Sequence, residues 1–138
     1  MHEVFDHTAD IGLRIRAETL DQLFCEAGEA LYSLIVANLD EVQPRSKANF
    51  TLSGREGEYD YLLFDWLNEL LFAFDARRMV FAKFEARVLP TGLQATAWGE
   101  ELDPARHRLE HEVKAITYHG LKVVREGPGW LAEVIVDI

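Results

Sequence analysis

Apolar residues recur along the chain with two different spacings, which predict two helices and a series of strands. A first helix is expected to begin after Thr19, because Gln22 follows three positions later in the order of a capping box. Asn38 is the expected end of this helix, and a second helix is predicted over about residues 57–77. The two apolar faces consist of Leu20, Leu23, Phe24, Ala27, Leu31, Leu34 and Ile35, and of Leu62, Leu63, Trp66, Leu67, Leu70, Leu71 and Phe74.

Strands are predicted wherever apolar and polar residues alternate with a period of two, or where an apolar run lies between turn residues. Pro90, Thr91 and Gly92 indicate a hairpin, and Gly120 is expected to interrupt a long extended stretch. The last strand is apolar on both faces, which is typical of a central strand covered on both sides. In chain order the predicted strands cover residues 3–8, 11–17, 47–52, 82–88, 93–97, 109–124 and 130–138.

Two helices and about eight mostly consecutive strands indicate an α+β fold. We expect two long amphipathic helices packed on a mostly antiparallel or mixed β-sheet. The chain has 138 residues, of which 49% are hydrophobic, and this length is the commonest size of one globular domain. The sequence therefore predicts a single domain over residues 1–138, with Trp66 in the middle of its core.

The formal net charge of −10 narrows the classes of partner. An acidic chain is repelled by phosphate backbones unless its basic residues gather on one face, and the arginine doublets are scattered. Direct nucleic-acid binding is therefore not expected, whereas a basic protein or a divalent cation suits the charge. No run of roughly 20 apolar residues and no leader pattern is present, so we expect a cytoplasmic protein without membrane contact. The single cysteine, Cys25, is predicted to be a buried hydrophobic residue.

Both ends of the chain carry candidate polar chemistry. His7 to Asp10 lie between two predicted strands, where Thr8 or Asp10 could also simply satisfy a turn. Asp137 closes an apolar strand, and a buried carboxylate needs a cation or several hydrogen-bond donors. Ile138 follows it and adds a terminal carboxylate, the alternative being a solvated chain end. Lys114, inside a predicted strand, is either a charge partner of these acids or a solvated edge residue.

Enzyme signatures are missing from the sequence. It contains no glycine-rich phosphate loop, no dinucleotide fingerprint, no H-E-x-x-H and no G-x-S-x-G. His107 and His111 lie four positions apart in a segment that is not predicted to be helical, so they do not form a helical metal pair. Zinc is not expected, and no catalytic residue is identified.

Several segments together resemble the archease family. These are His7-Thr8-Ala9-Asp10-Ile11-Gly12, the Leu62–Leu71 helix LLFDWLNELL, Gly99-Glu100, the segment Lys114–His119, and the final Asp137-Ile138. They occur in the family's order over the whole chain. The resemblance implies a protein that is not itself an enzyme and that activates an RtcB-type RNA ligase. It would promote guanylylation and multiple turnover of that ligase in tRNA splicing and RNA repair.

The resemblance also implies a divalent metal site formed by Asp10, Asp137 and Ile138. Oxygen ligands of this kind suit Ca²⁺, and they also accept Mg²⁺ or Mn²⁺. Neighbouring residues are expected to surround the metal or to contact the ligase. This group consists of His7, Thr8, Asp65, Lys114, Thr117, Tyr118 and His119.

The sequence is also compatible with two other functions. A metal-dependent phosphohydrolase could use Asp10 and Asp137, because metals held by carboxylates also activate water. A chaperone-like modulator of a nucleic-acid-processing protein would instead need a sizeable exposed apolar patch.

Overall fold

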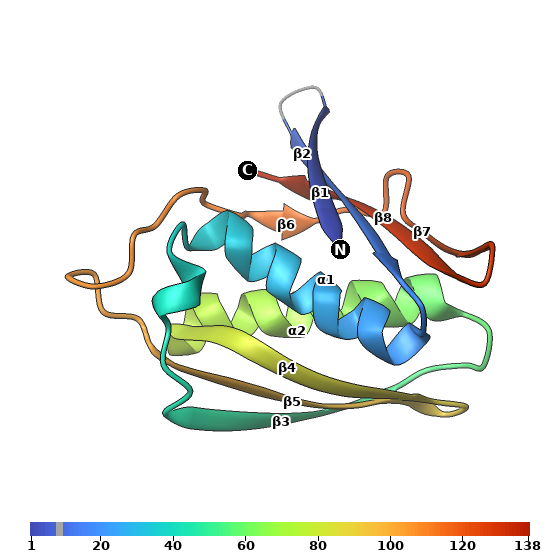
Figure 1. The fold of residues 1–138 in the computed structure, drawn as a ribbon, viewed down its shortest axis with the longest axis horizontal. Helices are drawn as coiled ribbons and strands as arrows, with labels where there is room; N and C mark the ends of the chain where they lie inside the picture. Colours follow the sequence, from blue (N-terminus) through green and yellow to red (C-terminus); the bar gives the residue numbers. More distant parts are fainter. Residues whose placement is uncertain (8–9) are drawn as a thin grey trace.

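The computed structural model describes the backbone of residues 1–7 and 10–138, and the α+β fold expected from the sequence is confirmed. Two α-helices lie side by side between two antiparallel β-sheets (Figure 1). Neither helix, among the described residues, is long and apolar enough to cross a membrane. The elements are β1 His2–His7, β2 Asp10–Ala17, α1 Leu20–Ile35, the short 3-10 helix η1 Leu39–Glu41, β3 Ser46–Ser53, α2 Tyr59–Arg77, β4 Met79–Leu89, β5 Gly92–Glu101, β6 Ala115–Ile116, β7 Lys122–Glu126 and β8 Gly129–Asp137.

The larger sheet is built around β8. Its strand order is β1-β2-β8-β6, and β7 also pairs with β8, so β8 has neighbours along both edges. This confirms the central position predicted from its two apolar faces. The smaller sheet has the order β3-β5-β4 and covers the other side of the helices.

Helix α1 begins as the capping pattern predicts. The Thr19 hydroxyl accepts a hydrogen bond from the Gln22 amide at 3.1 Å, which satisfies one of the unpaired donors of the first turn. The helix ends at Ile35, so Asn38 was wrongly predicted as its stop. Asn38 is buried instead, and its side chain bonds to the backbone of Arg106 and Arg108. The sequence alone does not distinguish an asparagine that ends a helix from one that makes buried hydrogen bonds.

Helix α2 supplies the centre of the core. Trp66 is fully buried, and its indole N–H donates to the Phe24 carbonyl of α1 at 2.9 Å. Its ring meets Phe50 of β3 edge to face, with centroids 5.2 Å apart, and Phe84 of β4 at 6.2 Å. One side chain thus joins both helices and the smaller sheet, because an aromatic ring offers a large apolar area and the indole one polar atom.

The long strand predicted over residues 109–124 was wrong in extent. Only β6 and β7 are strands in this region. Val113 and Ile116 are both buried, although they lie three positions apart, so the chain does not keep the alternation of a strand there. Gly120 then turns the chain with a φ of 67°, which favours glycine. Lys114 and Tyr118 consequently lie outside any strand.

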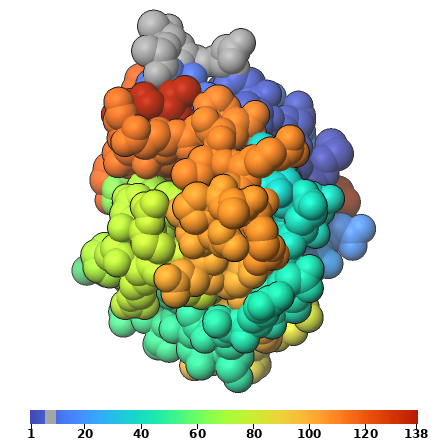
Figure 2. Space-filling view, turned by 90° about the vertical axis from the view of Figure 1, so that its left-hand side faces the viewer, coloured from blue at the N-terminus to red at the C-terminus, as the bar shows by residue number. Residues whose placement is uncertain are grey.

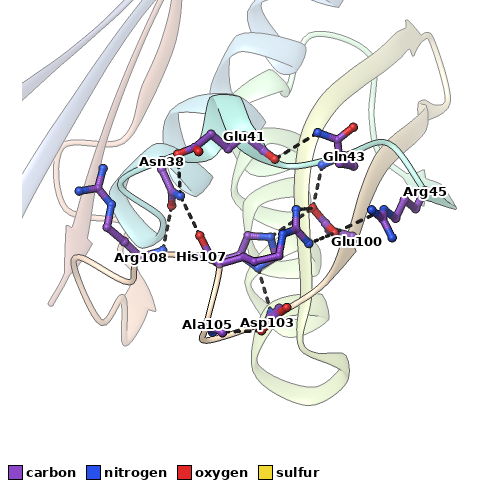
Figure 3. Close-up of polar contacts among 10 residues, drawn as sticks. Asn38, Glu41, Gln43, Arg45, Glu100, Asp103, Ala105, His107 and Arg108 are labelled. Atoms are coloured by element: carbon purple, nitrogen blue, oxygen red, sulfur yellow. Dashed lines mark hydrogen bonds and ion pairs between the residues drawn. The ribbon is translucent and has the colours of Figure 1, made fainter.

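A buried polar cluster, which we call the Glu100 clasp, fixes the chain between β5 and β6 (Figure 3). The Glu100 carboxylate is 7% exposed and accepts two hydrogen bonds from Arg106, at 2.7 and 3.0 Å. It also accepts the backbone N–H of Gln43 at 2.8 Å and lies 3.2 Å from Nε2 of His107. Nδ1 of His107 accepts the N–H of Asp103, so its proton lies on Nε2, facing Glu100.

The Glu100 clasp ties the segment after β5 to the segment after α1. Beside it, the Ala37 amide donates to the Arg108 carbonyl at 2.8 Å, and Val36 and Leu109 form an isolated β-bridge. The chain that leaves the clasp runs directly to β6. The clasp therefore helps to place β6 against the end of β8.

Replacing Trp66 by alanine should lower the free energy of unfolding by roughly 3–5 kcal/mol, because it leaves a large cavity and removes the hydrogen bond from the indole to helix α1. Thermal and denaturant unfolding measure this loss. Phe72→Ala on the same helix is the control, since Phe72 is 56% exposed and should change stability little. Equal stability of the two variants would contradict the core position of Trp66.

Glu100→Gln should lower the free energy of unfolding at pH 7 by about 1–3 kcal/mol. Hydrogen bonds from Arg106, and then from Gln43 and His107, outweigh burial and lower the pKa of Glu100 to about 2, from the ordinary 4.5. A carboxylate with a lowered pKa stabilises the fold above its unfolded pKa. The difference from wild type should therefore be full above pH 4.5 and disappear as the pH falls towards 2. Glu101→Gln, at the exposed neighbour, should show no such pH dependence.

Candidate metal site at the end of the central strand

Asp10 and Asp137 face each other across the central strand pair. Asp10 begins β2, Asp137 ends β8, and the antiparallel register makes them direct partners. Side chains directly opposite each other project to the same face of a sheet, with Cβ atoms roughly 4.5–5.5 Å apart. Both residues are half-buried. The fold thus brings together two carboxylates that are 127 positions apart (137 − 10) in the sequence.

The two carboxylates lie on the outer face of the larger sheet. Leu13 and Ile15 of β2 and their partners Val134 and Ala132 of β8 are fully buried against the helices. Successive side chains of a strand point to opposite faces, so the alternate positions, which include Asp10 and Asp137, point away from the helices.

Other charged residues on the same outer face neutralise one another. Glu3, Arg14, Glu133 and Lys122 lie in register across four strands. Arg14 contacts Glu133 at 2.7 Å and Glu3 at 3.9 Å, and Lys122 contacts Glu133 at 2.9 Å. The bond from Lys122, and then that from Arg14, lower the pKa of Glu133. In this row each acid faces a base.

An apolar row separates these ion pairs from the two aspartates. Gly12 of β2 pairs with Phe5 of β1 and Ile135 of β8. The Phe5 ring lies directly over Gly12, where an added Cβ would come within 2.1 Å of a ring carbon. A larger residue at this position would therefore have to displace the Phe5 ring. The next row beyond it pairs Asp10 with Asp137, and like charges directly opposite each other repel.

The backbone around Asp137 is held by β6. Ala115 pairs with Asp137, and the Lys114 amide donates to the Asp137 carbonyl at 2.7 Å. The Lys114 side chain is exposed and forms no ion pair within the described part of the chain. Ile138 is half-buried and packs against the core. Figure 2 shows the C-terminal residues at the surface, beside the segment coloured orange that contains β6.

The other residues expected near the metal lie in different places. Thr117 donates its hydroxyl to the Ile135 carbonyl at 3.0 Å, so it fixes the backbone beside β8. Tyr118 and His119 are exposed, and so is Asp65 on α2. The His7 side chain and Thr8 lie outside the described residues.

The donor set fits a hard cation. Asp10 and Asp137 provide carboxylate oxygens, and the described residues contain no group of three or more His, Cys, Asp or Glu side chains that could hold a metal ion. Among the described residues a main-chain oxygen could serve as a third ligand, and Ile138, next to Asp137, can offer one. Calcium, magnesium and manganese accept such ligands.

Other residues with potential chemistry have structural roles. His107 belongs to the Glu100 clasp rather than to a metal site. The sequence did not reveal the clasp, because Glu100 lies on the polar side of β5, Arg106 and His107 follow it in a loop without a periodic pattern, and Gln43 comes from a distant segment. Cys25 is half-buried, not fully buried as expected. Burial raises the pKa of its thiol to about 11, which keeps it protonated at neutral pH.

Taken together, the fold and site define a two-sheet α+β protein with paired carboxylates at the end of its central strand. The model of the archease protein family matches residues 2–138. Protein archease of Methanopyrus kandleri is 40% identical over 99% of this chain and 98% of its own length. Protein archease of Pyrococcus abyssi is 38% identical over 99% and 97%. The chain belongs to the archease family.

Solved structures agree with the fold. The solution structure of Methanobacterium thermoautotrophicum protein 1598 is 30% identical, covers 99% of this chain and 98% of its own, and has a TM-score of 0.84. The crystal structure of an archease from Thermotoga maritima, described as a possible chaperone, is 21% identical with a TM-score of 0.69 and shows the same fold.

Calcium should raise the melting temperature of the wild-type protein, because a ligand that binds only the folded state stabilises it by mass action. At a calcium concentration 100 times the Kd, the gain is about 2.7 kcal/mol. Asp10→Asn and Asp137→Asn should lose this response. Asp40→Asn, at an exposed acid of η1, should respond like wild type. A wild-type melting temperature unchanged by calcium, magnesium and manganese would rule out the site.

Proposed function

We propose that this protein is an accessory factor that binds a divalent metal and activates an RtcB-type RNA ligase. The single observation that carries the proposal is the direct pairing of Asp10 with Asp137 in a chain of the archease family. In this role the protein is not an enzyme. It would promote guanylylation and multiple turnover of the ligase in tRNA splicing and RNA repair.

The metal would be held by Asp10, Asp137 and an oxygen of Ile138. Two carboxylates in direct register repel each other, and a bound divalent cation replaces that repulsion by attraction. When bound, such a cation supplies positive charge that can stabilise phosphate oxygens during nucleotidyl transfer. Phe5 and Gly12 pair in the next row of the outer face, where the Phe5 ring covers the backbone beside the site.

The distribution of charge supports a protein partner rather than RNA. The formal net charge is −10, and Arg14 and Arg16, the arginines nearest this site on β2, are engaged by Glu3, Glu126 and Glu133. Arginines engaged in this way are not available to bind a phosphate backbone. An acidic surface favours association with a basic protein.

The test is to mix the protein with the purified ligase of the same organism, GTP and a divalent metal. The expected result is faster guanylylation of the ligase and several ligations per ligase molecule. Asp10→Asn and Asp137→Asn should reduce both to the level of the ligase alone, whereas Asp40→Asn should act like wild type. No stimulation by the folded wild-type protein at any metal concentration would refute the proposal.

A further inference from the structure

Three aromatic side chains gather on the outer side of α2, and we call this group the aromatic face. It consists of Tyr61, Phe64 and Tyr118. The Tyr118 ring stacks on Phe64, with centroids 3.9 Å apart and planes 16° apart, and Tyr61 approaches Tyr118 at 6.0 Å. Tyr61 and Tyr118 are nevertheless 54% and 56% exposed. Grouped exposed aromatic residues mark interaction surfaces, where tyrosine is enriched.

The fold holds Tyr118 in place before any partner binds. The amide and hydroxyl of the preceding residue, Thr117, both bond to the Ile135 carbonyl of β8 at 3.0 Å. The Leu121 amide donates to the Tyr118 carbonyl at 3.1 Å across the turn that Gly120 makes. With its backbone held in this way and its ring stacked on Phe64, Tyr118 loses less conformational freedom on binding than a mobile side chain would.

Two carboxylates extend the aromatic face along α2. Tyr61, Asp65 and Glu69 follow one another at intervals of four residues, which places them on one stripe of the helix, and both acids are exposed. Asp65 and Glu69 are neighbouring like charges that repel each other. Within the described residues neither forms an ion pair, whereas Glu3, Glu126 and Glu133 on the larger sheet are all paired with bases.

This combination of groups identifies the chemistry of the partner. Arginine and lysine side chains pair with carboxylates, and a guanidinium also stacks on tyrosine rings. An RNA would instead bring its phosphates against Asp65 and Glu69. We propose that the aromatic face is the docking surface for the ligase and meets a basic, arginine-rich or lysine-rich surface on it. This inference rests on the proposed function.

The pairing of β6 with β8 brings the aromatic face close to Asp137. Ala115 of β6 pairs with Asp137, and Tyr118 follows three residues later, at most about 11 Å away. A ligase that docks on Tyr118 therefore lies beside the sheet edge at which Asp137 sits, although the two aspartates point to the sheet face away from the helices. Docking and metal binding use different residues, so they can be separated by substitution.

The experiment measures binding of the full chain to the purified ligase by calorimetry at low and high salt. Tyr61→Ala combined with Tyr118→Ala should weaken binding at least about tenfold. Asp65→Lys combined with Glu69→Lys should do the same, and high salt should weaken wild-type binding. Leu109→Ala is the control for the tyrosines, since Leu109 is 53% exposed beside the end of α1. Asp40→Lys is the control for charge, and melting temperatures verify that each variant is folded.

Guanylylation assays on the same samples separate this inference from the proposed function. The tyrosine variant should still activate the ligase when its concentration is raised in proportion to its weaker binding, whereas Asp10→Asn should bind normally and not activate. Folded tyrosine and lysine variants that bind the ligase as tightly as wild type would overturn the docking surface and leave the proposed function intact. A wild-type protein that neither binds nor activates the ligase would overturn both. Binding of single-stranded RNA that is lost in the tyrosine variant would assign the face to RNA and overturn the proposal.

Discussion

The register between β2 and β8 is the constraint on which the rest of the molecule depends. It aligns Leu13 with Val134 and Ile15 with Ala132 against the helices, and it places Asp10 opposite Asp137 on the other face. A slip of one residue would turn every side chain of a strand to the opposite face. Burial of the apolar set therefore fixes the acidic pair without any attraction between the two aspartates.

Carboxylates are treated in two different ways in this protein. Glu133 and Glu100 each face cationic groups of the chain itself, in the ion-pair row of the larger sheet and in the Glu100 clasp. These acids stabilise the fold, because removing one partner of an ion pair would leave the other without its hydrogen bonds. Asp65 and Glu69 have no such partner within the described residues, and their charge is directed outward. In this way some acidic residues stabilise the fold, and others remain available to bind a partner.

Features set by local patterns were predictable from the sequence. Thr19 and Gln22 cap α1, and the spacing around Trp66 defines the buried side of α2, since both signals lie within a few residues. The interruption at Gly120 was predicted, but the strand over residues 109–124 was overestimated, because the hydrogen bonds from Thr117 to Ile135 are set by tertiary packing. The pairing of Asp10 with Asp137 required a register between the two ends of the sequence. The resemblance to a family named both residues, but no periodic pattern could bring them together.

The position of β8 in the chain has a consequence for how the protein folds. β2 is made early and β8 last of the described strands, and the Arg14–Glu133 pair that joins them spans 119 positions. Contacts of such long sequence separation form slowly, because the entropy cost of closing a long loop comes before the contacts contribute any stability. During synthesis, the β1–β2 hairpin therefore lacks its neighbouring strand until β8 has been made. Asp10 and Asp137 thus come together only when β8 pairs with β2, and a cation bound there would stabilise only the fully folded protein.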